Sequence, residues 1–150
     1  MSEMKKRTFT LIEAQNLLPV MESLLRTSME SKRRIEEIEE EFKKINYSIF
    51  LRGGVQLDIV ALSRLRAESD KAIQRVKDAM AEIESIGALV KDLDIGLIDF
   101  PCVVDRTTVL LCWKLGEQRI THWHETNEGF GARKPIDERI ARAGKAKKAN

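Results

Sequence analysis

The stretch Leu51-Arg52-Gly53-Gly54 lies between two long amphipathic segments of this 150-residue chain and determines how they are arranged. Two consecutive glycines permit the positive φ angles that a reversal of the backbone needs. Apolar residues recur every three or four positions on both sides of this break, which predicts an α-helix on each side. Two helices joined by a short turn predict an antiparallel helical hairpin over residues 8–87, with packing of the coiled-coil type.

The first helix has a clear start and one irregularity. Thr10 and Glu13 have the spacing of a capping box, so the helix is predicted to begin near Leu11. Its apolar stripe continues to Ile49, which would make a helix roughly 58 Å long. Pro19 lacks a backbone donor, and it predicts either a kink or a short first segment that ends there.

The second helix is predicted to run from Val55 or Gln56 to Ile86, with Gly87 as its C-terminal cap. A hairpin covers only one side of each helix. The wide apolar stripe of the first helix therefore predicts packing against a second copy or against the C-terminal segment. We expect a homodimer formed through the helices.

After Gly87 the apolar pattern changes to a period of two, which predicts a small antiparallel sheet over residues 88–131. The strands are expected at 88–91, 97–104, 107–115 and 118–124. A two-residue turn at 105–106 would place Asp99 opposite Cys112. The predicted fold class is therefore α+β, a long antiparallel helical hairpin followed by a small antiparallel β-meander.

The last predicted strand contains both histidines of the chain, His122 and His124. Residues two apart in a strand point to the same face, and two converging imidazoles are a common metal-binding arrangement. The sequence thus predicts a metal site on the sheet, compatible with zinc, iron, manganese or nickel. The carboxylate and thiol groups that could complete it come in two ranks. The first rank is Glu125, Glu128 and Asp99, and the second is Asp92, Asp94 and Cys112.

The register of the last hairpin decides which of these residues reach the histidines. A two-residue turn at Gly116-Glu117 would place the histidines on the face of Leu111 and Trp113. A three-residue loop would place them with Asp99 and Cys112 instead. Alternatives to a metal site are a structural role for the histidines, metal-free acid/base catalysis, a pH-sensitive contact, and nucleophilic catalysis by the cysteine.

Charge is balanced overall but unevenly distributed. The chain has 26 basic and 24 acidic residues, too even a balance for DNA or membrane attraction by bulk charge. Residues 88–131 carry four basic and seven acidic residues, whereas 132–150 carry seven and two. Residues 132–150 are predicted to be a basic, flexible tail, with one short helix from Asp137. Binding of nucleic acid by this tail is disfavoured, since such basic runs are common and unspecific.

Several motifs resemble those of a bacterial family, the domain-of-unknown-function family 2203. The resemblance covers about residues 8–135, and the stretches that carry it are Phe9 to Pro19, Lys91 to Pro101, Leu111 to Glu117, and Thr121 to Glu125 with Glu128-Gly129-Phe130. It implies long helices before a compact C-terminal part. It also draws attention to Asp92, Asp94, Asp99, His122, His124, Glu125 and Glu128. The family implies no substrate.

These features together predict a cytoplasmic, homodimeric metal-binding protein, because two cysteines and the absence of an apolar span suit a reducing, aqueous compartment. Metal-dependent hydrolysis is a further expectation, should the metal keep an open position. The alternative is a non-catalytic helical scaffold that binds a protein partner without metal.

Overall fold

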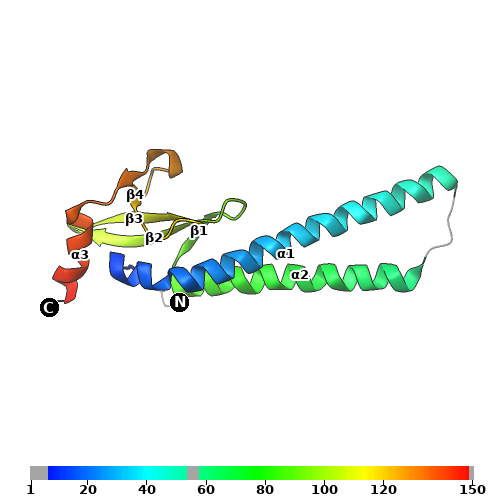
Figure 1. The fold of residues 1–150 in the computed structure, drawn as a ribbon, viewed down its shortest axis with the longest axis horizontal. Helices are drawn as coiled ribbons and strands as arrows, with labels where there is room; N and C mark the ends of the chain where they lie inside the picture. The colour runs from blue at the N-terminus through cyan, green and yellow to red at the C-terminus, as the bar shows by residue number, and fades with distance from the viewer. Residues whose placement is uncertain (1–6, 54–57, 149–150) are drawn as a thin grey trace, which may run out of the picture.

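A computed structural model describes residues 7–53 and 58–148 of the chain (Figure 1). The order of elements is two long helices, a sheet and a final helix. The helices are α1 (Leu11–Arg52), α2 (Ile59–Ile86) and α3 (Glu138–Lys148), and a short 3₁₀ helix, η1, spans Phe130–Ala132. The strands are β1 (Leu89–Asp92), β2 (Leu97–Val104), β3 (Thr107–Lys114), β4 (His122–Glu125) and β5 (Lys134–Pro135). The predicted α+β class is confirmed.

The ends of α1 follow the sequence signals. Thr10 Oγ1 accepts the backbone N–H of Glu13, and the Glu13 carboxylate accepts the N–H of Thr10, so the predicted capping box is present. Gly53 ends the helix with a φ of 67°. Pro19 lies inside α1 without ending it, so the expectation of a separate first segment is wrong. Buried side chains on both sides of the proline, Leu18 and Met21, hold this part of the helix against the core.

α2 begins after Asp58, whose carboxylate accepts the N–H of Ala61, and ends at Gly87 with a φ of 108°. The predicted start at Val55 or Gln56 lies outside the described residues. Side chains that turn toward α1 recur at the alternating three and four spacing of a coiled coil, and those that are buried are Ala72, Ala79 and Ile83. The predicted antiparallel hairpin is confirmed, and in Figure 1 the two helices diverge toward its far end.

The sheet is antiparallel throughout and its strands follow in chain order, β1-β2-β3-β4-β5. Asp105 and Arg106 both have positive φ, as a two-residue hairpin turn requires, and Asp99 lies opposite Cys112 as predicted. One face of the sheet packs on the start of α1 and the end of α2. Its core includes Ile98, Phe100, Leu111, Trp113 and Trp123, together with Met21, Leu25 and Ile83 of the helices.

The hairpin between β3 and β4 decides the position of the histidines. His122 pairs with Cys112 and His124 with Leu110, so the histidines share the face of Asp99 and Cys112. This is the pairing of the three-residue loop, although the observed loop is longer and β4 begins only at His122. The alternative with a Gly116-Glu117 turn is wrong. Ile120 packs in the helix-side core. The residues just before His122 therefore leave the sheet, and β4 begins only at His122.

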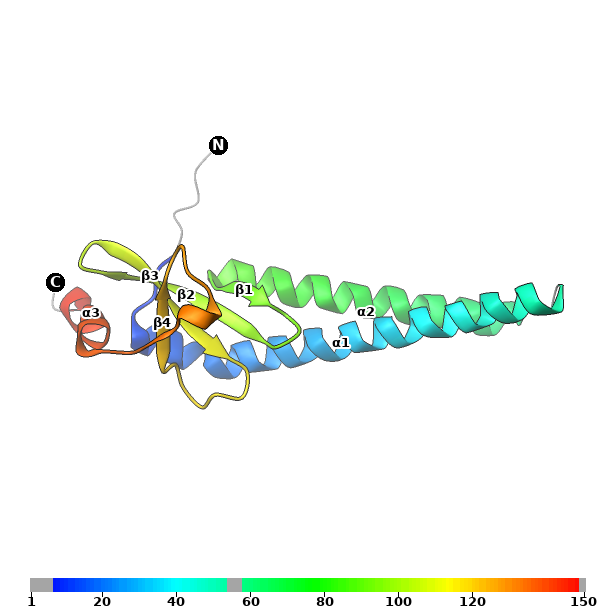
Figure 2. The same ribbon diagram turned by 90° about the horizontal axis from the view of Figure 1, so that it is seen from above.

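The segment predicted as a basic tail contains β5 and α3. Asp137 caps the first turn by accepting the N–H of Ile140, as the sequence indicated. Ile140 is completely buried, so α3 packs at the end of the sheet away from the hairpin tip (Figures 1 and 2). Among the residues that the structure describes, no helix is both long and apolar enough to cross a membrane.

Candidate metal centre

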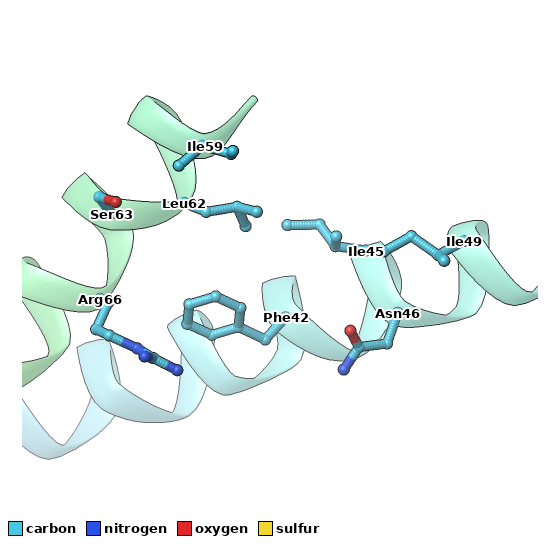
Figure 3. Close-up of a pocket in the computed structure, with 8 residues that line it drawn as sticks. All are labelled: Phe42, Ile45, Asn46, Ile49, Ile59, Leu62, Ser63 and Arg66. Carbon is cyan, nitrogen blue, oxygen red and sulfur yellow. The ribbon is translucent and has the colours of Figure 1, made fainter. Parts of the chain in front are cut away.

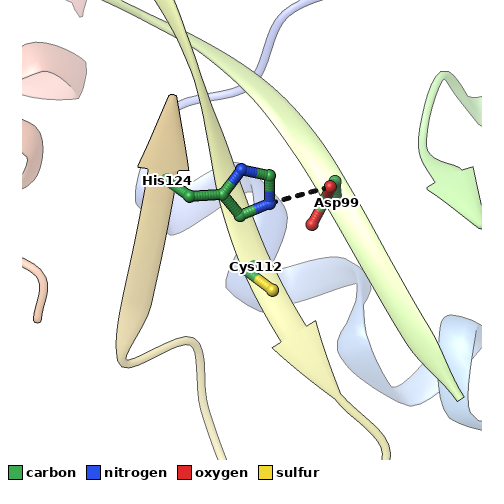
Figure 4. A group of neighbouring side chains, drawn as sticks. All are labelled: Asp99, Cys112 and His124. Atoms are coloured by element: carbon green, nitrogen blue, oxygen red, sulfur yellow. Dashed lines mark hydrogen bonds and ion pairs between the residues drawn. The ribbon is translucent and has the colours of Figure 1, made fainter. Parts of the chain in front are cut away.

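Three adjacent strands bring an aspartate, a cysteine and a histidine together on the sheet face opposite the hairpin. Asp99 lies on β2, Cys112 on β3 and His124 on β4 (Figure 4). The imidazole of His124 reaches across β3 toward Asp99, and the Cys112 side chain lies beside them. Their potential ligand atoms, a carboxylate oxygen, a thiol sulfur and an imidazole nitrogen, all lie within 4.8 Å of one another.

The group is closed to solvent. Asp99 and Cys112 are 0% exposed and His124 is 2% exposed. Nε2 of His124 lies 3.0 Å from Oδ2 of Asp99, the distance of a hydrogen bond. Burial of a carboxylate is costly unless it is paired, so this contact offsets part of the cost of burying Asp99.

The orientation of His124 is set by the backbone. Nδ1 lies 2.8 Å from the carbonyl oxygen of Glu125. A carbonyl oxygen only accepts hydrogen bonds, so Nδ1 donates its hydrogen to Glu125. Nε2 therefore faces Asp99 and Cys112. Histidines that bind metals commonly donate their second N–H in this way, which fixes the ring and its tautomer. A carboxylate oxygen also only accepts, so the hydrogen bond between Nε2 and Oδ2 of Asp99 needs a further proton between these two atoms, and a bound cation would take the place of that proton.

Asp99 has one carboxylate oxygen without a hydrogen-bond partner in the part of the chain that the structure describes. Its Oδ2 contacts His124, whereas its Oδ1 is buried without a hydrogen-bond partner among the described residues. Nearly all buried polar atoms in native proteins have a partner. The unpartnered oxygen is therefore an observation that an interior cation would explain.

Cys112 is held as a neutral thiol in the metal-free protein. Burial and the nearby Asp99 carboxylate together raise the pKa of Cys112 to about 12, although the Arg133 guanidinium acts to lower it. A nucleophilic cysteine needs a lowered pKa. Catalysis by this thiol with His122 therefore has no support in the geometry, because Nδ1 of His122 contacts Oγ1 of Thr121 instead.

The remaining first-rank candidates lie outside the group. His122 is half-buried and lies opposite Cys112 on the same face, but its ring is not among the three clustered ligands. Glu125 is exposed and pairs with Val109, whose side chain belongs to the opposite, helix-side core. The Glu128 carboxylate accepts the N–H of Glu125, and this bond together with Lys134 lowers the pKa of Glu128.

Asp92 and Asp94 serve the turn between β1 and β2. The Asp92 carboxylate accepts the backbone N–H of Asp94, and the Asp94 carboxylate pairs with Lys32 of α1. Asp92 thus stabilises the turn and Asp94 joins it to α1, so neither carboxylate is part of the buried group.

A segment between β4 and β5 lies on the side of the sheet away from the helices (Figures 1 and 2), and its Arg133 is near enough to Cys112 to act on the pKa of that thiol. Nη2 of Arg133 donates hydrogen bonds to both carboxylate oxygens of Glu117, at N–O distances of 3.1 and 2.9 Å. This contact joins the segment to the β3–β4 loop. The Arg133 side chain is only 11% exposed. No local sequence pattern predicts this contact, because the two residues are 16 positions apart and each belongs to an irregular segment.

Comparison with known proteins gives a family and nothing more specific. No curated protein and no solved structure matches the chain. A match to the family described as "Uncharacterized conserved protein (DUF2203)" extends over residues 7–136, which include both long helices, all five strands and the Asp99, Cys112 and His124 group. The chain therefore belongs to the DUF2203 family.

Proposed function

We propose that the protein binds one divalent transition-metal ion through Asp99, Cys112 and His124. The observation that carries this proposal is a buried group of three different donors in which one oxygen of Asp99 has no partner. The cation would accept that oxygen and Nε2 of His124 as ligands. It would also favour the thiolate form of Cys112, offsetting the effect of burial.

The donor set narrows the choice of metal. Thiolate and imidazole ligands together suit zinc or iron(II), and nickel is also compatible. Manganese prefers oxygen ligands and fits less well than the other three metals. Zinc is the first ion to test.

Burial favours a structural role for the ion. Structural zinc sites have four protein ligands and are closed, whereas catalytic sites keep a position for water or substrate. His122 is our candidate for the fourth ligand, since it shares the sheet face and lies opposite Cys112. Metal-dependent hydrolysis would need access to the ion, and hence displacement of the segment that carries Arg133.

The proposal is tested by metal analysis of untagged protein, followed by removal of metal and titration with zinc and cobalt(II). We expect one ion per chain and a higher unfolding temperature for the loaded protein. Cobalt(II) should give a thiolate-to-metal charge-transfer band in the near ultraviolet. Folded protein that binds none of zinc, cobalt, iron or nickel stoichiometrically would remove the proposal.

The two cysteines provide a matched pair of variants. Cys112→Ala should abolish the cobalt charge-transfer band and weaken zinc binding by at least roughly tenfold. Cys102→Ala should retain both, because Cys102 is buried on the helix-side face. His122→Ala distinguishes two forms of the site. Zinc affinity should fall in this variant if His122 is the fourth ligand, and should stay the same if only three residues bind the ion. Equal zinc affinity in both cysteine variants would contradict the proposed ligands.

A second candidate function is a metal-free interaction module. It is favoured by the large apolar side chains exposed at the far end of the hairpin, which include Tyr47, Phe50 and Leu51. This function does not require the Asp99, Cys112 and His124 group to bind a metal, since the exposed end and the sheet are separate parts of the molecule (Figure 1).

A further inference from the structure

The far end of the helical hairpin has an apolar surface that one chain leaves uncovered. Here α1 and α2 diverge, and a groove of about 480 Å³ opens between them (Figure 3). Phe42, Ile45 and Ile49 line it from α1, and Ile59 and Leu62 from α2. Leu62 of α2 and Ile45 of α1 point toward one another across the groove (Figure 3).

The apolar surface continues around the groove. Phe50 is 80% exposed and Ile59 is 71% exposed, and Tyr47, Leu51 and Val60 are also mostly exposed. Apolar patches of this kind on a helical hairpin mark contact surfaces. Two hairpins together cover such stripes as the core of a four-helix bundle.

The spacing of residues on α1 is self-complementary. The stripe on this part of α1 has six positions, which are Ile35, Ile38, Phe42, Ile45, Ile49 and Arg52. Successive positions are three, four, three, four and three residues apart, so the spacing is the same when the helix is followed in either direction. Ile38 is already buried within one chain, whereas the other apolar positions of the stripe are half-buried. A second α1 in the antiparallel direction therefore matches the first at the level of these half-buried residues. Phe42 of each copy falls at the level of Ile45 of the other, as a two-fold interface requires.

The charges suit the same register. Five of the six residues at positions 36–41 are glutamates, and all five are exposed. In the antiparallel register Arg52 of one copy falls at the level of Ile35 of the other, next to Glu36. Basic Arg52 thus meets the acidic segment of the second copy, and charge complementarity of this kind fixes the register of an interface.

We infer that the hairpin end, residues 42–52 with 58–66, binds a second copy of this chain in an antiparallel four-helix arrangement. The two sheets then lie at opposite ends of the dimer, away from the interface. The inference does not depend on the metal centre, which is on the sheet and is measured separately by its metal content.

Sedimentation equilibrium of the full chain at micromolar concentration tests the inference. We expect a dimer that becomes monomeric when Phe42 and Ile45 are both replaced by alanine, with the helical circular dichroism signal retained. A wild-type chain that is monomeric up to about 100 μM, well above the range of specific dimers, would overturn it, as would a double variant that is folded and still dimeric.

A charge exchange tests the register. Arg52→Glu should raise the dimer dissociation constant roughly tenfold, and adding Glu36→Arg should restore it. Glu84→Arg, an exposed change at the other end of α2, should leave the constant unaltered. If the Arg52→Glu variant dimerises as tightly as the wild type, or if the exchange fails to restore it, the antiparallel register is wrong.

Discussion

At the scale of single residues, His124 is the side chain that ties the sheet together on the face opposite the helices. Nδ1 donates to its own strand and Nε2 contacts Asp99 of β2, so one ring spans three strands. Both residues are buried, and their contact is therefore much less screened by water than an ion pair at the surface.

His124→Ala is expected to destabilise the metal-free protein severely. It removes the imidazole that pairs with the buried Asp99 carboxylate and leaves only the neutral Cys112 thiol beside that carboxylate. Breaking a buried pair in this way typically costs about 3–5 kcal/mol. His122→Ala removes a half-buried contact with Thr121 and should cost about 1 kcal/mol or less. Urea denaturation of both variants checks the difference. Equal losses would mean that the pairing with Asp99 does not stabilise the fold.

At the scale of elements, turns and helix pairs depend on a few close contacts. Gly96, between β1 and β2, has a φ of 71°, and a Cβ added there would lie 2.6 Å from Cβ of Leu115. Both the conformation and the space thus require glycine at this turn. The two long helices have a charged contact of their own, in which Glu68 of α2 accepts hydrogen bonds from Arg34 of α1.

Gly96→Ala should lower the free energy of unfolding by about 1–3 kcal/mol, since backbone strain and the clash with Leu115 act together. Gly129→Ala is the control. Gly129 has an extended backbone with φ of −121°, and an added Cβ would meet nothing within 4 Å. Its effect should be within about 0.5 kcal/mol. Thermal unfolding measures both, and a neutral Gly96→Ala would show that the turn readily adopts another form.

The contact between Arg34 and Glu68 predicts a pH dependence. The hydrogen bonds and charge of Arg34 lower the pKa of Glu68 below its ordinary value of 4.5. The folded state thus binds this proton less readily than the unfolded state, so the stabilisation is present above about pH 4.5 and is lost as the pH falls through the lower, folded-state pKa.

Glu68→Gln should therefore lower the unfolding temperature near pH 7, and this difference should shrink as the pH falls below about 4.5. Asp70→Asn, at an exposed residue two positions further along α2, is the control and should have little effect across this pH range. A difference for Glu68→Gln that persists unchanged in acid would exclude the ion pair as its cause.

At the scale of the whole molecule, the residues before α1 join the helical and sheet parts. The N–H of Phe9 donates to the carbonyl oxygen of Pro101 in β2, and its ring packs edge-on against Phe100 with centroids 5.4 Å apart. Lys32 and Asp94 form a second link, between α1 and the turn after β1. The hairpin and the sheet therefore share one continuous core.

Phe9→Ala is expected to cost about 3–5 kcal/mol, because the ring is 2% exposed and its loss leaves a cavity between helix and sheet. Val103→Ala, at a side chain that is 45% exposed on β2, should cost less than about 1 kcal/mol. Urea unfolding followed by circular dichroism checks both. Separate transitions for helix and sheet in the Phe9 variant would identify this contact as the link between them.

The sequence by itself determined the local elements, because their signals are local. The capping box at Thr10, the glycine at 87 and the two-residue turn at 105–106 act within a few positions, and each has its predicted role. The alternating pattern also fixed the pairing of Asp99 with Cys112, since that turn leaves one register.

Only the tertiary structure decided which side chains meet. The β3–β4 register depends on Ile120 entering a core formed with distant helices, and on its N–H donating to the Gln15 side chain, 105 positions away. Neither contact is visible in a local pattern. This register brought His124 to the pair formed by Asp99 and the second-rank candidate Cys112, and left Glu125 and Glu128 outside. Spacing alone sets the face of a strand, whereas packing against the rest of the chain sets its neighbours.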